Sequence, residues 1–187
     1  MVKRKTCVFI SGKGSNLKNL ISCSRDSSFP IKICLVVSDN KNAHGINYAR
    51  KFNIPVILVN TKIKNYENKI LLNLKKYKIS FICLAGYMKI VSNILIKNYR
   101  NRIINIHPSL LPKFKGLNTF TRMLRSNEVK AGCTVHFVNS KLDGGSTIIK
   151  KIFFIDPDDN EQHLKKKTQK LEYKAFPEAI VKIFRNY

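Results

Sequence analysis

The chain has 187 residues, with 35 Lys and Arg against 11 Asp and Glu, for a formal net charge of +24. Its length fits one ordinary domain, and its 44% hydrophobic and 25% charged residues exclude a disordered polyelectrolyte or a fibrous repeat. No run of about 18 apolar residues is present, which excludes a membrane-spanning helix. The basic N-terminal residues pass directly into a strand-like stretch, a pattern that argues against a signal peptide.

Short β-rich segments alternate with helical patterns through the first part of the chain. The helical spacing is clearest at Leu17, Leu20 and Ile21, and it returns at Ile70 and Leu74. This alternation is typical of βαβ units and predicts an α/β fold: a Rossmann-like, open, mostly parallel sheet with helices on both faces. The expected strands are Cys7–Ser11, Ile31–Ser38, Pro55–Val59, Phe81–Ala85 and Ile103–His107.

The pattern changes after residue 106. Gly132–Val138 and Thr147–Ile155 are predicted to be two further strands, with antiparallel pairing near the C-terminal end of the chain. Glu161–Arg185 is predicted to be a long terminal helix, which we expect Pro177 to interrupt. Because no linker, internal repeat or change of composition separates these segments, we expect a single domain over residues 1–187.

The positive charge has two explanations. Clustered Lys and Arg would indicate a nucleic-acid partner, because neutralising phosphates releases counterions. An AT-rich coding sequence would also enrich Lys, Asn and Ile. The lysines are spread along the chain, and only Lys165–Lys167 form a run of three. We therefore favour compositional drift and expect no specific nucleic-acid binding.

The cysteines indicate a reducing compartment. Their number is odd, their spacing is wide, and none forms a CxxC pair. A disulfide framework or a zinc site needs closer or paired spacing, so we expect buried reduced thiols, a cytoplasmic location and no bound metal. The cysteines are Cys7, Cys23, Cys34, Cys83 and Cys133.

A glycine-containing loop, residues 11–16, follows the first strand and opens the first helix. Glycines allow close backbone approach, and the N–H groups of a helix start attract anions, most often phosphate. Ser15 and Asn16 add side-chain donors. The alternative is a plain strand-to-helix turn with Ser15 as its N-cap, and the residues alone leave both interpretations open.

The end of the fifth strand carries a second candidate site. Period-two alternation puts Asn105 and His107 on one face, and Pro108 follows them. An amide that donates to an oxyanion, beside an imidazole that titrates near neutrality, suits acyl-type transfer through a tetrahedral intermediate. A polar pair that merely closes the strand is the alternative. Asp143 lies in a turn and gains a catalytic role only if it reaches His107, whose pKa it would then raise.

Four motifs resemble the folate-dependent formyltransferases, in the same order and over nearly the whole chain. The Asn/His/Asp set is shared by that superfamily, and the Gly-x-Gly-Ser-Asn loop resembles its glycinamide ribonucleotide branch. The motifs are Gly14-Ser15-Asn16, Leu84–Ile90, Asn105–Pro112, and Val135–Val138 leading to Leu142–Gly145.

This resemblance implies transfer of a formyl group from 10-formyltetrahydrofolate to the amine of glycinamide ribonucleotide, without a metal. It implies a phosphate-binding part at about residues 1–100 and a catalytic and folate-binding part at about residues 101–187. The implied catalytic residues are Asn105, His107 and Asp143, with His107 in proton transfer and Asp143 raising its pKa. The implied ligand contacts are Gly14, Ser15, Asn16 and Glu172 for the ribonucleotide, and Met88, Lys89, Ile90, Val91, Asn105, Leu142 and Gly144 for folate.

Several positions depart from the pattern of that family. Ile63 stands where an arginine near the folate tail is common, so Lys62 or Lys64 is expected to serve the tail as a point charge. Asn118 replaces a common histidine, and Ser140 replaces a common acidic residue. The chain also ends at Tyr187, earlier than is usual in the family.

Two other functions remain as alternatives. The same chemistry with methionyl-tRNA as acceptor is disfavoured, because that branch carries an additional tRNA-binding domain and a different first loop. A basic nucleic-acid-binding module with relic catalytic residues would show binding that survives physiological salt. The expected partners are therefore glycinamide ribonucleotide and folate, with no membrane, and both a monomer and a homodimer stay open.

Overall fold

The computed structural model describes residues 2–185, so the chain end at Tyr187 lies outside the described residues. Seven strands form one mixed sheet in the order β3-β2-β1-β4-β5-β6-β7. The strands are β1 Arg4–Ile10, β2 Ile31–Ser38, β3 Val56–Leu58, β4 Phe81–Leu84, β5 Ile103–His107, β6 Lys130–Phe137 and β7 Thr147–Phe154. The helices are α1 Ser15–Ser24, α2 Gly45–Lys51, α3 Tyr66–Lys76, α4 Asn93–Asn98, α5 Thr119–Arg125 and α6 Glu161–Arg185.

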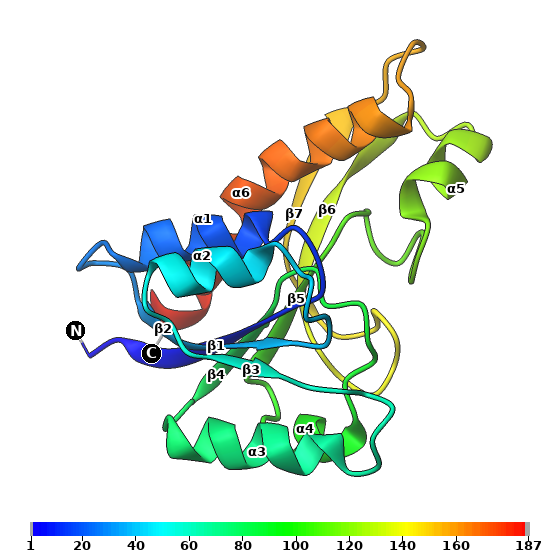
Figure 1. The fold of residues 1–187 in the computed structure, drawn as a ribbon. Helices are drawn as coiled ribbons and strands as arrows, with labels where there is room; N and C mark the ends of the chain where they lie inside the picture. Colours follow the sequence, from blue (N-terminus) through cyan, green and yellow to red (C-terminus); the bar gives the residue numbers. More distant parts are fainter. Residues whose placement is uncertain (1, 186–187) are drawn as a thin grey trace. The chain divides into compact units, whose positions relative to one another are not determined.

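The chain divides into two compact units, Met1–Asn105 and Ile106–Tyr187. In the first unit, β1 pairs in parallel with β2 and β4, β2 with β3, and β4 with β5. Figure 1 shows α1 and α2 on one face of these strands and α3 and α4 on the other. The predicted α/β sheet with helices on both faces is confirmed.

Burial on both faces explains why these strands read as continuous apolar runs. The last five residues of β1 and all four of β4 are buried, because helices cover each side of the sheet. A half-exposed strand would instead alternate apolar and polar residues. The largest fully buried side chains of the first unit include Phe9, Leu17, Leu35, Ile82 and Ile103.

The second unit is built on an antiparallel pair. β6 pairs with β7 from Lys130↔Phe154 to His136↔Thr147, with an irregularity between Val135 and His136. The helix α6 packs against both strands (Figure 1). A small core of Met123, Ala131 and Leu164 ties α5 and α6 to β6, and the partly buried ring of Phe114 packs against it. The predicted antiparallel pairing near the C-terminal end is confirmed.

One helix prediction is wrong. Pro177 lies inside α6 and does not interrupt it, since the helix runs unbroken over 25 residues. A proline inside a helix costs about 3 kcal/mol. Phe176 and Ile180 flank it and are fully buried, and each such side chain contributes about 1.5–3 kcal/mol. Packing on both sides of Pro177 therefore offsets the lost hydrogen bond.

The structure contains free cysteines, most of them buried. All five cysteines are free; Cys7, Cys83 and Cys133 are buried, whereas Cys23 and Cys34 are half-buried. Burial raises the pKa of the Cys133 thiol to about 12, so this group stays protonated at neutral pH. Within residues 2–185, no helix combines the length and apolar character that crossing a membrane requires.

Candidate active site

His107 and Asp143 meet in the second unit. His107 is the last residue of β5 and is buried, while Asp143 lies in the turn between β6 and β7 with a φ of 45°. Asp tolerates this left-handed conformation better than most residues. The two side chains face each other, with Nδ1 of His107 3.4 Å from Oδ2 of Asp143. The contact on which a catalytic role for Asp143 depends is thus present.

Two further groups hold the Asp143 carboxylate. The N–H of Gly116 donates to its Oδ2 at 2.8 Å, and Nε2 of the buried His136 lies 3.6 Å from its Oδ1. Burial alone would raise the pKa of Asp143. The hydrogen bonds from His136 and Gly116 and the charges of the two histidines outweigh that effect and lower the pKa to about 2. Asp143 is therefore a carboxylate at any physiological pH.

The imidazole of His107 has a defined proton position. Its Nε2 lies 2.9 Å from the carbonyl oxygen of Phe114. Since a carbonyl only accepts, Nε2 carries the proton in this arrangement. Burial lowers the pKa of His107 below its ordinary value; the Phe114 contact and Asp143 raise it, but not enough to reverse the shift. The expected effect of Asp143 on the pKa of His107 is present, but desolvation is larger, so the net shift is downward.

The loop after β5 is fastened to β6 through Thr134. The buried hydroxyl of Thr134 donates to the carbonyl of Ser109 at 2.7 Å and accepts from the N–H of Leu111 at 3.1 Å. The hydroxyl of Ser109 donates to the carbonyl of Lys113 at 2.7 Å. These bonds fix the path of the chain between His107 and Phe114, and with it the partner of Nε2.

The glycine-containing loop of the first unit is built on close backbone contact. Gly14 is the N-cap of α1 with a φ of 71°, and a Cβ placed on it would lie 2.3 Å from Cα of Gly45. The N–H of Gly45 donates to the carbonyl of Gly12 at 3.1 Å. Ser15 is the first residue of α1, so the alternative in which Ser15 is the N-cap is wrong. The loop brings the start of α1 against the start of α2.

Ser11 connects this loop to the one that follows β4. Its hydroxyl donates to Oδ1 of Asp39 at 2.5 Å and accepts from the N–H of Met88 at 2.8 Å. Within the first unit, the loop of residues 11–16 and the segment from Met88 to Val91 are therefore hydrogen-bonded neighbours. Met88 and Ile90 expose 57% and 77% of their area, which is unusual for side chains of this size and leaves them available to an apolar ligand.

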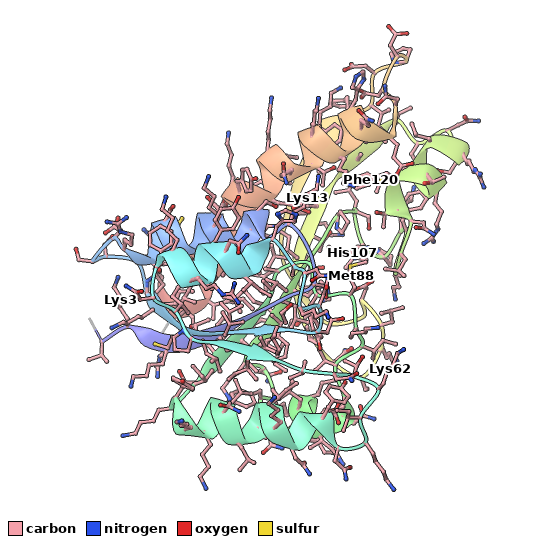
Figure 2. All side chains as sticks on the ribbon, viewed as in Figure 1. Lys3, Lys13, Lys62, Met88, His107 and Phe120 are labelled. Atoms are coloured by element: carbon pink, nitrogen blue, oxygen red, sulfur yellow. The ribbon has the colours of Figure 1, made fainter. Side chains whose placement is uncertain are left out.

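The remaining candidates of the first unit follow other strands. Lys62 and Lys64 lie between β3 and α3, beside the exposed Ile63. Figure 2 shows Lys13, Met88 and Lys62 at one end of this unit and Lys3 at the opposite end. This agrees with the rule that ligands bind outside the carboxyl ends of parallel strands. Asn105 is the last residue of the first unit and pairs with Leu84 across the β4–β5 ladder.

The second unit holds the other predicted residues. Leu142 and Gly144 flank Asp143 in the turn, and Leu142 is 55% exposed. Glu172 lies on α6, where its charge helps raise the pKa of the Cys133 thiol on β6. The charge of Glu172 therefore acts close to Cys133 on β6.

Sequence reasoning gave no role to several residues of this site, although one of them, His136, lies within the Val135–Val138 motif. His136 and Thr134 share one face of β6 by period-two alternation, and that signal was available. Phe114 and Gly116 contribute only backbone groups, which no side-chain pattern reveals. Within residues 2–185, the structure shows no cluster of three or more His, Cys, Asp or Glu side chains able to hold a metal ion.

Comparison with known proteins identifies the class to which this fold and site belong. Residues 4–180 match the family described as formyl transferase, and the chain belongs to that family. The phosphoribosylglycinamide formyltransferase of Haemophilus influenzae is 35% identical over 183 residues, which cover 95% of this chain and 85% of that protein.

Other relatives are longer, and several have solved structures. The trifunctional purine biosynthetic protein adenosine-3 of Drosophila melanogaster is 38% identical over 95% of this chain, but the chain spans only 14% of its length. The phosphoribosylglycinamide formyltransferase of Anaplasma phagocytophilum has a TM-score of 0.92 at 32% identity, covering 99% of this chain and 89% of that one. The Brucella melitensis enzyme of the same name has a TM-score of 0.90 at 36% identity, covering 98% and 96%.

Proposed function

We propose that this protein transfers the formyl group of 10-formyltetrahydrofolate to the amine of glycinamide ribonucleotide, a step of purine synthesis. The observation that carries the proposal is the contact of His107, at the end of β5, with Asp143 in the β6–β7 turn: Nδ1 lies 3.4 Å from Oδ2, and both side chains are buried. The membership of the family and the names of relatives with similar length support the same reaction.

The chemistry requires stabilisation of an oxyanion and movement of one proton. The substrate amine attacks the formyl carbon, a C–N bond forms, and the carbonyl oxygen becomes an oxyanion. The Nε2–H of His107 can donate a hydrogen bond to this oxyanion. The oxyanion then competes with the Phe114 carbonyl for the same N–H. Asn105, two residues earlier on β5, supplies an amide donor. Such donors are worth about 10²–10³-fold in rate.

Asp143 stabilises His107 as the proton moves. Its carboxylate faces Nδ1, the nitrogen that is bare while Nε2 holds the proton. For Nε2 to take the proton of the amine, the ring proton must first move to Nδ1, where the carboxylate of Asp143 accepts a hydrogen bond from it. The imidazolium that then forms donates from Nδ1 to Asp143 and from Nε2 toward the oxyanion. The intermediate then collapses, the bond from the formyl carbon to N10 of the folate breaks, and N10 leaves with a proton. The products are the N-formyl ribonucleotide and tetrahydrofolate.

The ribonucleotide is assigned to the start of α1 and to one acidic residue of α6. The N-terminus of α1 at Gly14, Ser15 and Asn16 suits its phosphate, because the backbone N–H groups and the dipole of a helix start favour an anion. Glu172 is the proposed acidic contact of the ribose hydroxyls. Each assignment rests on the family pattern together with the local structure.

The folate is assigned to exposed apolar and basic groups. Met88, Lys89, Ile90 and Val91 of the loop after β4, and Leu142 and Gly144 beside Asp143, are the proposed pterin contacts. Lys62 and Lys64 are the proposed partners of the carboxylate tail, held as flexible point charges rather than as the bidentate fork of an arginine. The five free cysteines favour the cytosol as the place of the reaction.

The experiment is a formyl-transfer assay with the purified protein. Mass spectrometry should detect N-formylglycinamide ribonucleotide when 10-formyltetrahydrofolate and glycinamide ribonucleotide are both supplied, and Asn105→Ala and His107→Ala should each reduce the rate by about 10²-fold or more. Methionyl-tRNA, offered as the acceptor in parallel, should not be formylated. Absence of turnover with a folded protein, or wild-type rates in both variants, contradicts the proposal.

A further inference from the structure

The segment from Phe114 to Leu117 orients both members of the His107–Asp143 pair. The carbonyl of Phe114 accepts from His107, and the N–H of Gly116 donates to Asp143. Phe114 and Gly116 both have positive φ values, 56° and 76°. A non-glycine residue with positive φ persists only where its surroundings hold it, so this segment needs an external restraint.

Arg122 supplies that restraint from α5. Its Nη1 donates to the carbonyl of Lys115 at 2.6 Å and to the carbonyl of Leu117 at 3.3 Å. Its guanidinium also lies over the ring of Phe114, 5.7 Å from the ring centroid. The four residues thus alternate in their partners: 114 and 116 bond to the catalytic pair, while 115 and 117 bond to Arg122.

The helix that carries Arg122 is itself fixed in place. Met123, the next residue, is 1% exposed and packs in the core with Ala131 and Leu164. The hydroxyl of Thr121, the preceding residue, donates to Oε2 of Glu161 at 3.0 Å at the start of α6. Arg122 therefore extends from an anchored helix, and its two bonds transmit that anchorage to the segment.

We infer that Arg122 is a positioning residue of the proposed reaction: by holding the carbonyls of Lys115 and Leu117, it keeps Phe114 on Nε2 of His107 and Gly116 on Asp143. This inference rests on the proposed function for its catalytic consequence and on the contacts above for its structural part. Arg122 donates to the carbonyls of Lys115 and Leu117, so its effect on the rate passes through the backbone of residues 114–117.

The position also has an electrostatic effect, which must be separated from the positioning role. The positive charge of Arg122 contributes to the lowered pKa of His107, as the smallest of the causes, after burial and the other neighbours. A charge effect alone moves the acid limb of a pH–rate profile and leaves the plateau at high pH, where His107 is neutral, unchanged. Loss of positioning lowers the plateau itself.

The experiment compares three variants of the whole protein. Arg122→Met keeps a long side chain over Phe114 but has no donor and no charge. Arg122→Lys has both donors and charge. Arg125→Met is the matched control, at an exposed position of the same helix. We expect the plateau of kcat to fall about tenfold in Arg122→Met and to return to within about threefold of wild type in Arg122→Lys, since misplacement by about 1 Å can cost 10²-fold. Arg125→Met should behave as wild type.

A second measurement is independent of substrate. Long-range ¹H–¹⁵N spectra of the His107 ring should show the Nε2–H form in the wild type and a shift toward the Nδ1–H form in Arg122→Met, because the Phe114 carbonyl is no longer held. Arg122→Gln, which is too short to reach both carbonyls, replaces Arg122→Met if the latter does not fold. A wild-type ring spectrum and plateau in either variant overturn the inference. A shifted ring spectrum in a protein whose wild type does not transfer formyl groups overturns only the proposed function.

Discussion

His136 places its Nε2 3.6 Å from Oδ1 of Asp143, so the carboxylate lies between two buried imidazoles. The other nitrogen of His136, Nδ1, lies 2.8 Å from the carbonyl of Phe137, so each ring nitrogen has an acceptor beside it. The side chain of His136 is only 2% exposed. A second histidine therefore supports the same carboxylate that supports His107.

Replacing His136 by Phe should raise the pKa of Asp143 above about 2, because the hydrogen bond from His136 is one of the main causes of the depression. The fold should also lose about 1–3 kcal/mol, since the carbonyl of Phe137 loses its contact with Nδ1 of His136. Urea unfolding measures the second effect, and an NMR titration of the Asp143 carboxyl carbon measures the first. His163→Phe, at a side chain that is 51% exposed, is the control. An unchanged Asp143 titration would contradict the role given to His136.

The activity should follow the neutral form of His107. Because burial lowers its pKa, the acid limb of kcat/KM should have its midpoint below 6.5, and activity should be retained at neutral pH. The same shift makes the stability of the fold depend on pH. Because the unfolded state binds the proton more tightly, neutral His107 stabilises the fold above about pH 6.5. This stabilisation is lost as the pH falls from about 6.5 through the folded-state pKa. Rates measured between pH 5 and pH 9 test this: a midpoint above 6.5 would contradict the lowered pKa of His107, and a rate that rises as the pH falls would exclude the neutral imidazole as the active form.

Asp143→Asn should separate charge from shape. The amide oxygen of Asn can still accept from the N–H of Gly116, so the turn should keep its conformation. The imidazolium of His107 loses its counter-charge, and the rate of transfer should fall by about 10²–10⁴-fold. The comparison is with Asp158→Asn on the exposed turn before α6, which should keep the full rate. A rate for Asp143→Asn within threefold of wild type would remove the carboxylate from the mechanism.

The sequence was sufficient for the strands and for the longer helices. The second strand has the predicted bounds, Ile31–Ser38, since its apolar run is buried on both faces and is bounded by polar and turn-forming residues. The short helices α2, α4 and α5, of six or seven residues, are too brief for a helical period to stand out. Their formation depends on tertiary packing, as at Met123 of α5.

From the sequence, the candidate site could be predicted only for residues that contribute a reactive side chain. Asn105, His107 and Asp143 stand out through their chemistry and their places at a strand end and a turn. The direction of the pKa shift of His107 depends on how deeply it is buried, which no local pattern encodes. The contacts of Phe114 and Gly116 with this pair are backbone contacts, and Arg122 enters only through them.

The glycine-containing loop allows a comparison between two glycines two residues apart. A Cβ on Gly14 would lie 2.3 Å from Cα of Gly45, a backbone atom that cannot rotate away, and the φ of +71° disfavours any L side chain. A Cβ on Gly12 would meet no heavy atom within 4 Å. The two positions therefore differ in what a methyl group costs, although both lie in the loop that opens α1.

Gly14→Ala should destabilise the fold by about 2 kcal/mol or more, combining the cost of the left-handed conformation with the displacement of α2. Because this shift moves the N–H groups proposed to bind the phosphate, the KM for glycinamide ribonucleotide should rise about tenfold, while kcat changes less. Gly12→Ala should leave the unfolding free energy within about 0.5 kcal/mol of wild type. Denaturant unfolding and steady-state kinetics measure these effects. If Gly14→Ala matches the wild type in both, the close approach to Gly45 does not shape the loop; if it loses stability but keeps its KM, the phosphate binds elsewhere.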